Sequence, residues 1–208
     1  MTVLITIPHG ATPSGDGNHN SDIGATKFLS FLEEALEAMS IPYTIMVGTV
    51  NRDILDLNRL RAHSHPWIID VRSQLLEHEL HIDLHSYPKE LGEVRTSTGY
   101  DLQVWGQHTV VLFNTPEITD QDFLRSIEAE LEEVARPTAE EQGGFENYVS
   151  NLATVLMDVP SLVVELNEGE SQNYPLVASA LAVGILNHLE RLDEQLPLDD
   201  ELLPAELA

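Results

Sequence analysis

The segment from Thr2 to Gly10 reads TVLITIPHG, and it decides how the rest of the sequence is interpreted. Its first six residues are apolar apart from two threonines, and Pro8 ends the run, which predicts a short buried strand. The residues that follow, 8–20, are all loop formers, and Ser21 then provides the N-cap of a helix. The beginning of the chain therefore predicts a strand, a polar loop and a helix, in that order.

The same alternation continues along the chain. Further strands are predicted at Tyr43–Val47, His81–Leu84, His108–Phe113 and Ser161–Leu166, and further helices at 66–79, 120–135 and 174–192. Strands that alternate with helices form a mostly parallel or mixed sheet, and near-continuous apolar strands suit a sheet that is covered on both faces. We expect one α/β domain over residues 1–195, with helices on both faces of the sheet, and an acidic C-terminal arm at 196–208.

Composition excludes several classes of function. The chain has 208 residues and no cysteine, which rules out disulfides, thiol catalysis, iron–sulfur clusters and zinc ribbons. The absence of cysteine fits a reducing compartment, and we expect a cytoplasmic protein, since no apolar run of about 18 residues predicts a membrane span. With 10 Lys and Arg against 35 Asp and Glu, the net charge of −25 repels nucleic acid and anionic lipid. The expected partner is a small-molecule or short-peptide substrate.

The few arginines are unevenly distributed. Five of the eight lie between positions 52 and 95, at Arg52, Arg59, Arg61, Arg72 and Arg95. Arginines gathered in one region of an acidic chain predict a local site for an anion. Pairing with surface carboxylates is the alternative, and we favour it for Arg61 and Arg72.

Side chains that can bind a metal or transfer a proton follow the predicted strands. In a sheet of parallel strands, ligands bind beyond the carboxyl ends of the strands. His9 follows the first strand, His85 the third, and Glu165 lies at the end of the Ser161–Leu166 strand. Imidazole and carboxylate groups without cysteine form the ligand set of a catalytic zinc site, in which three protein ligands leave one position for water.

His9 and His85 are the predicted histidine ligands of this site. Asp22 opens the first helix and is the expected oxygen ligand, with Asp16 and His19 as its competitors. Each residue also has an ordinary explanation. His9 alone would be a loop residue, and Asp22 alone would be a carboxylate favoured by the positive end of the helix.

Other signals are weaker. The glycine-containing first loop lacks the pattern of a phosphate-binding loop, and the histidines of His78-Glu79-Leu80-His81 do not have the spacing of H-E-x-x-H. Ser86 follows His85, but no G-x-S-x-G elbow surrounds it, so a serine nucleophile is not expected.

Five short segments resemble the N-formylglutamate amidohydrolases, which are related to aspartoacylase and to zinc carboxypeptidase-like enzymes. Their family patterns are P-H-S-G, D-L-N-R, D-x-H-S, G-G-Y and I-E-I-N. The matching segments lie in the same order at Ile7–Gly10, Asp56–Arg59, Ile82–Ser86, Gly143–Phe145 and Val163–Asn167.

The resemblance implies a zinc-carboxypeptidase-like (phosphorylase/hydrolase-like) fold and a hydrolase of amide bonds with one Zn²⁺ per chain. It makes His9, Asp22 and His85 the metal ligands. Glu165 matches the carboxylate that such enzymes use as general base and acid.

The substrate contacts follow from the same comparison. Asn58 and Arg59 match the pair that holds a substrate carboxylate or polarises the scissile carbonyl, so Arg59 is also a predicted catalytic residue. Arg52 and Tyr87 are predicted to contact the substrate beside them.

The predicted substrate is a small acyl-amino acid or peptide with a free carboxylate. The sequence departs from the family in its shorter length, in a compressed interval between His9 and Asp22, and in the segment Glu168–Tyr174. These differences leave open a peptidase acting on γ-glutamyl or cell-wall peptides. A non-catalytic binding protein that retains the fold and a metal-free hydrolase are the alternatives from other classes.

Overall fold

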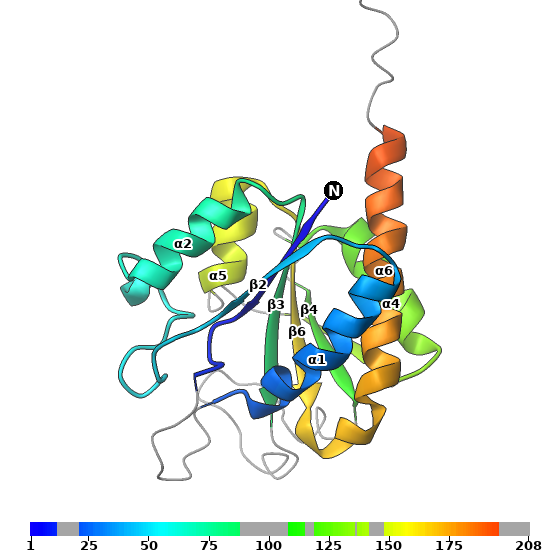
Figure 1. The fold of residues 1–208 in the computed structure, drawn as a ribbon, viewed down its shortest axis with the longest axis horizontal. Coiled ribbons are helices and arrows are strands. Elements are labelled where there is room, and N and C mark those ends of the chain that lie inside the picture. Colours follow the sequence, from blue (N-terminus) through cyan, green and yellow to red (C-terminus); the bar gives the residue numbers. More distant parts are fainter. Residues whose placement is uncertain (12–20, 88–107, 115–118, 136, 142–147, 196–208) are drawn as a thin grey trace, which may run out of the picture.

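A mixed six-stranded sheet forms the centre of the molecule. The computed structural model describes residues 1–11, 21–87, 108–114, 119–135, 137–141 and 148–195. The strands follow the order β2-β1-β3-β6-β4-β5 across the sheet (Figure 1). Their bounds are β1 Val3–Ile7, β2 Tyr43–Val47, β3 Leu80–Tyr87, β4 Val110–Asn114, β5 Pro137–Glu141 and β6 Ser161–Asn167. The first four in this order are parallel, whereas β4 runs antiparallel to β6 and β5 runs parallel to β4.

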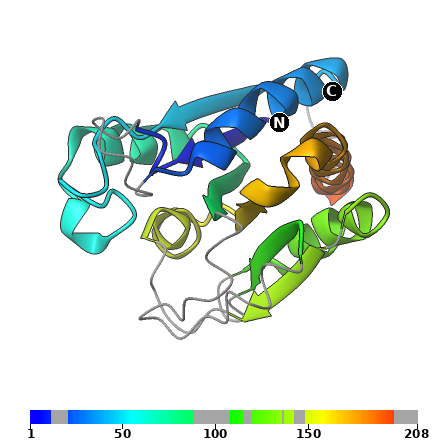
Figure 2. The same cartoon turned by 90° about the horizontal axis from the view of Figure 1, so that it is seen from below.

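Helices cover both faces of this sheet (Figure 2). One face packs against the helices α1 (Ile23–Ala38), α4 (Gln121–Glu132) and α6 (Tyr174–Gln195). The other face packs against α2 (Pro66–Leu75) and α5 (Tyr148–Asn151), which continues into a π-helical turn at Leu152–Leu156. Two short 3₁₀ helices, at Leu60–Ala62 and Glu168–Asn173, complete the described secondary structure.

The two faces of the sheet differ in chemistry. Successive side chains of a strand point to opposite faces, so β1 presents Val3, Ile5 and Ile7 to the α1–α4–α6 side. Strand β3 alternates in the same way, with Leu80, Ile82 and Leu84 on that apolar side. Three residues that alternate with these, His81, Asp83 and His85, form a buried polar row on the opposite face. The predicted ligand His85 therefore lies on the face that packs against α2 and α5.

The predicted fold class is confirmed, with differences in detail. Strand β3 extends to Tyr87, so His85 and Ser86 belong to the strand and not to the loop after it. Helix α2 ends at Leu75 instead of Glu79. Strand β5 was not predicted, because its sequence, PTAEE, carries no apolar alternation and pairs through its backbone with β4. The predicted acidic arm at 196–208 lies outside the described residues.

Among the helices of the described residues, none is both long and apolar enough to cross a membrane.

Candidate metal centre

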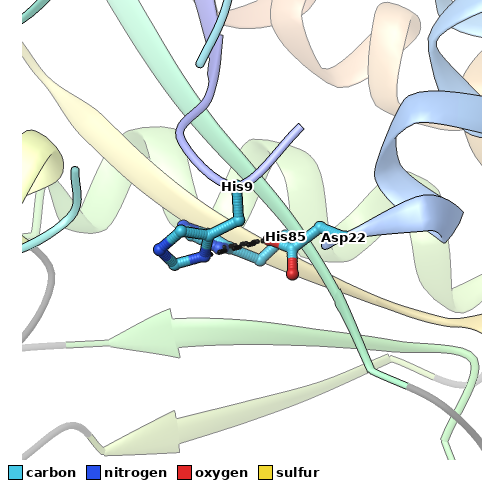
Figure 3. Close-up of side chains that lie close together, drawn as sticks. All are labelled: His9, Asp22 and His85. Atoms are coloured by element: carbon cyan, nitrogen blue, oxygen red, sulfur yellow. Dashed lines mark hydrogen bonds and ion pairs between the residues drawn. The ribbon is translucent and has the colours of Figure 1, made fainter. Parts of the chain in front are cut away.

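The three predicted metal ligands lie together. His9 follows β1, Asp22 is the N-cap residue of α1, and His85 lies near the end of β3 (Figure 3). One ligand atom from each residue lies within 4.8 Å of the others, and all three side chains are buried. The imidazole rings of His9 and His85 meet edge to face, with their centroids 5.1 Å apart.

His9 presents one free ring nitrogen to this cluster. Its Nε2 is 2.8 Å from Oδ1 of Asp56, so Nε2 carries the proton and donates it to the carboxylate. Its Nδ1 is buried and makes no hydrogen bond within the described part of the chain, and it lies 3.4 Å from Oδ2 of Asp22. A buried imidazole nitrogen and a carboxylate oxygen that face each other in this way are two donors that one metal ion can bind together.

His85 has the same arrangement. Its Nδ1 lies 2.8 Å from Oδ2 of Asp22, and its Nε2 lies 3.2 Å from Oδ2 of Asp83. Burial alone would lower the pKa of His85, but the carboxylates of Asp83 and Asp22 outweigh it and raise that pKa well above its ordinary value. Both histidines therefore point Nδ1 into the cluster and Nε2 at a supporting carboxylate.

Asp22 is held in place by the backbone around it. Its N–H donates to the carbonyl of His9 at 3.0 Å, which joins the beginning of α1 to the end of β1. The carboxylate makes no capping hydrogen bond to its own helix and is directed at the histidines instead. Burial would raise the pKa of Asp22, but its contacts with His85 and His9 lower it to about 2.

A second contact fixes the same helix end against β3. Oε1 of Glu168 accepts hydrogen bonds from the N–H of Gly24 and from the hydroxyl of Ser86, at 3.0 and 2.8 Å. A Cβ atom on Gly24 would lie 2.7 Å from both Cγ of Glu168 and the hydroxyl of Tyr174. Only glycine allows α1 to approach this closely, and that approach sets the position of Asp22.

The donor set fits zinc. Two imidazole nitrogens and one carboxylate oxygen are a known ligand combination of catalytic zinc sites, and each histidine has the supporting acceptor that orients such ligands. The hydroxyl of Ser86 donates to Glu168, and both nitrogens of His85 face carboxylates. This arrangement gives Ser86 no histidine base to activate it.

Glu165 lies beside this centre. It pairs in register with His85 on the neighbouring strand, so the two side chains leave the sheet on the same face. The side chain is partly buried, and burial raises the pKa of Glu165 to about 7. The charge of Asp22 acts in the same direction, and the charges of His85, His9 and Arg52 oppose it. A carboxyl group with a pKa near neutrality can both accept and donate a proton at physiological pH.

Two arginines converge on the outer side of Asp56. Oδ2 of Asp56 lies 3.3 Å from Nε of Arg52 and 3.8 Å from Nε of Arg59, whereas Oδ1 holds His9. Burial opposes ionisation, but His9 and the two arginines outweigh it and lower the pKa of Asp56. The side chains of Arg52 and Arg59 are each 37% exposed, so cationic surface borders the metal cluster.

The other two residues predicted to contact substrate are engaged within the protein. Asn58 is fully buried: its Oδ1 accepts the N–H of Val149, and its Nδ2 lies 3.2 Å from Nε2 of His85. The hydroxyl of Tyr87 donates to the carbonyl of His108, and its ring packs against Val111, Phe113 and Val163. Asn58 is therefore buried between Val149 and His85 and does not line an exposed substrate site.

The sequence did not predict a role for two carboxylates that contact the predicted metal ligands. Asp56 and Asp83 lie inside the quoted segments D-L-N-R and D-L-H-S, yet only the structure shows each one bonded to a predicted metal ligand. One signal could have found Asp83, because its two-residue spacing from His85 places both side chains on one face of a strand. The competing ligands Asp16 and His19 and the segment Gly143–Phe145 lie outside the described residues.

Similarity to known proteins is confined to solved structures. No protein-family model matches the sequence, and no curated protein matches it. An N-formylglutamate amidohydrolase from Ralstonia eutropha JMP134 superposes with a TM-score of 0.57 at 13% identity, over 92% of this chain and 94% of that one. A gene product from Agrobacterium tumefaciens gives a TM-score of 0.62 at 13% identity, over 92% and 91% of the two chains.

A metallo-carboxypeptidase from Burkholderia cenocepacia is similar over part of its length. It gives a TM-score of 0.55 at 12% identity, over 92% of this chain and 57% of that one. These similarities establish a carboxypeptidase-like fold, and they agree with the amidohydrolase resemblance of the sequence motifs.

Proposed function

We propose that this protein is a zinc-dependent hydrolase that cleaves an amide bond in a small acyl-amino acid or peptide bearing a free carboxylate. The observation that carries the proposal is the pair of buried histidines whose Nδ1 atoms face Asp22, beside a glutamate whose pKa is about 7. The fold shared with an N-formylglutamate amidohydrolase and a metallo-carboxypeptidase supports the same reaction class.

His9, Asp22 and His85 would hold the metal. Zinc bound to such a set polarises a carbonyl oxygen and brings the pKa of a water close to neutrality. Asp56 and Asp83 keep the two imidazoles in the tautomer that leaves Nδ1 available, because each accepts the proton on Nε2.

Glu165 would manage the protons of the reaction. As a carboxylate it takes a proton from the attacking water, and as a carboxylic acid it delivers that proton to the nitrogen of the leaving amine. Its place opposite His85 in the sheet puts it on the same face as the metal ligands, and its raised pKa makes both protonation states accessible near pH 7.

Arg59 and Arg52 would bind the substrate carboxylate. Both border Asp56, whose other oxygen holds His9, so their guanidinium groups lie next to the metal cluster. In a chain with a net charge of −25, an anionic substrate needs such a local cationic site.

One alternative, a non-catalytic binding protein that retains the fold with a degraded site, would take up no metal even under saturating zinc. The other, a metal-free serine hydrolase, has little support in the geometry, since Ser86 donates to Glu168 and both nitrogens of His85 are engaged.

The test uses protein purified without a histidine tag. We expect about one zinc per chain and hydrolysis of an N-formyl or other N-acyl amino acid that stops on chelation and returns on addition of zinc. An ordered protein that takes up no metal under saturating zinc would favour the binding protein, and turnover of γ-glutamyl or cell-wall peptides in place of N-acyl amino acids would favour the peptidase. Hydrolysis that survives chelation would contradict the proposal.

A further inference from the structure

Buried polar side chains form a continuous chain behind His85. Asp83 contacts Thr6, Thr6 contacts His81, His81 contacts Ser161, and Ser161 contacts Ser150. The distances between their polar atoms are 2.7, 2.9, 2.7 and 2.9 Å in that order. Three of these side chains, those of Thr6, His81 and Asp83, have no exposed surface at all.

Strand register creates this chain. Thr6 of β1 is the direct partner of Asp83 on β3, and His81 of β3 is the direct partner of Ser161 on β6. The four side chains therefore leave three adjacent strands on one face. Ser150, from α5, closes the end that lies farthest from the metal cluster.

The proton positions in this chain follow from counting donors. Thr6 has one hydroxyl proton and donates it to Oδ1 of Asp83, so toward His81 it can only accept. His81 must then carry its proton on Nε2, which donates to Oγ1 of Thr6.

The same count settles the other half of the chain. Complete burial lowers the pKa of His81 to about 4, so the ring is neutral and its Nδ1 accepts a hydrogen bond from Ser161. Ser161 has then used its proton and accepts one from Ser150. Every hydrogen bond from Ser150 onward therefore points toward Asp83.

We propose that Thr6, His81 and Ser161 are positioning residues for the metal centre, because their directed hydrogen bonds hold Asp83 as the acceptor of the Nε2 proton of His85. With Oδ1 of Asp83 fixed by Thr6, Oδ2 faces Nε2 of His85, and Nδ1 of His85 is left to face the metal. This inference rests on the proposed function, since it assigns a purpose to residues that serve the metal ligand His85.

An explanation by packing alone fits the pattern less well. The opposite face of the same strands is apolar, and its residues, Ile5, Ile82 and Val164 among them, pack without any polar group. A neutral histidine that is buried between strands needs a partner for each nitrogen, and a polar core of this kind is retained at a cost in stability. This row of hydrogen bonds ends at Asp83, whose other oxygen contacts the proposed ligand His85.

Substitution of Thr6 separates positioning from packing. Thr6→Val keeps the shape of the side chain but removes the hydroxyl, which leaves Oδ1 of Asp83 and the Nε2 proton of His81 without their partner. Thr6→Ser keeps the hydroxyl and is the matched control. Ile5→Ala, on the same strand but on the opposite face, weakens packing without touching the chain.

Zinc affinity of the folded proteins, measured by competition with a chromophoric chelator, is the principal readout. Loss of a group that orients a metal ligand typically weakens metal binding by about 10- to 100-fold, and we expect about tenfold for Thr6→Val, one link farther away. Thr6→Ser and Ile5→Ala should bind zinc as the wild type does. Ser161→Ala, which removes the donor to Nδ1 of His81, provides a second test if Thr6→Val does not fold, and a smaller loss is expected.

The ¹⁵N chemical shifts of His81 in the metal-free protein provide a readout that does not depend on zinc. They should report a neutral ring protonated on Nε2, and a ring protonated on Nδ1 would overturn the donor order. Wild-type zinc affinity in both Thr6→Val and Ser161→Ala would show that the chain serves packing alone, and it would leave the proposed function intact. A wild-type protein that binds no zinc would overturn both proposals.

Discussion

Oδ2 of Asp22 lies 2.8 Å from Nδ1 of His85, so in the metal-free protein a proton occupies the place of a metal. Because its carboxylate neighbours raise the pKa of His85 well above the ordinary value, this ring is doubly protonated at neutral pH. Metal binding at Nδ1 must displace one proton. We therefore expect zinc affinity to rise with pH, by up to about tenfold per pH unit while His85 remains protonated.

Calorimetric titration at several pH values, in two buffers with different ionisation enthalpies, measures both the affinity and the protons released. Release of about one proton per zinc at pH 7 is expected. An affinity that is independent of pH between 6 and 8 would show that zinc binding does not displace a proton from His85.

Substitution of Glu165 should separate turnover from metal binding. Glu165→Gln has nearly the same shape but cannot accept or deliver a proton, so turnover should fall by about 10²- to 10⁴-fold. Zinc content should stay at one per chain, because Glu165 is not one of the proposed ligands. Near-normal turnover would exclude the role, and loss of zinc would make Glu165 a ligand.

The same substitution should change how stability depends on pH. Burial raises the pKa of Glu165 to about 7, so between about pH 4.5 and 7 the folded protein holds a proton that the unfolded chain has lost. Stability linked to this group is therefore present at low pH and is lost as pH rises through 7. Relative to wild type, Glu165→Gln should gain up to about 3 kcal/mol between pH 4.5 and 8, because glutamine never ionises.

Denaturant unfolding of both proteins in the presence of a chelator measures this difference. Comparing the two proteins at each pH removes the contributions of other groups, among them His81, which both proteins share. A difference that stays constant with pH would mean that Glu165 has an ordinary pKa in the folded protein.

The arginines can be tested with an altered substrate. A substrate whose free carboxylate is converted to an amide should lose much of its kcat/KM with the wild type, and Arg59→Ala should remove the difference between the two compounds. Arg61→Ala is the matched control, since Arg61 is exposed and follows the same segment. Equal cleavage of both compounds by the wild type would show that the carboxylate is not recognised, even where zinc chemistry holds.

Gly24 should prove intolerant of a side chain. In Gly24→Ala the new Cβ would meet Glu168, Ser86 and Tyr174 at less than 3 Å, so the start of α1 must move away from β3. Asp22 lies two residues away and would move with it, which should lower both the melting temperature and the zinc affinity. Ser179→Ala, at an exposed position of α6, is the control for a harmless substitution in a helix. A Gly24→Ala protein with unchanged zinc affinity would show that Asp22 is positioned independently of this contact.

The sequence predicted much of the site because its ligands follow strands. Apolar runs located β1, β3 and β6, and the rule that ligands gather at the carboxyl ends of parallel strands brought His9, His85 and Glu165 to one edge. The three proposed ligands do lie together. What local patterns could not show was the direction of β4, which depends on the pairing of Val111 with Glu165 across an antiparallel ladder.

The contacts of the supporting residues with partners far away in the sequence were beyond prediction for a related reason. Asp56 holds a histidine 47 positions earlier in the chain, and Thr6 holds an aspartate 77 positions later. Such contacts depend on strand order and register, which no local pattern encodes. The length of β3 was underestimated because polar side chains at His85 and Ser86 resemble a loop, although every residue of the strand except Ser86 is buried.

Asp56 fixes a distance within the proposed site. One of its oxygens holds the proposed metal ligand His9, and the other lies against Arg52 and Arg59, so a single side chain fixes the spacing between the proposed metal site and the cationic surface. A substrate would have to match that spacing with the length of its own skeleton between the scissile amide and the free carboxylate. Among homologous acids that differ by one methylene, a hydrolase of the proposed kind should therefore select for length before it selects for the chemistry of the acyl group.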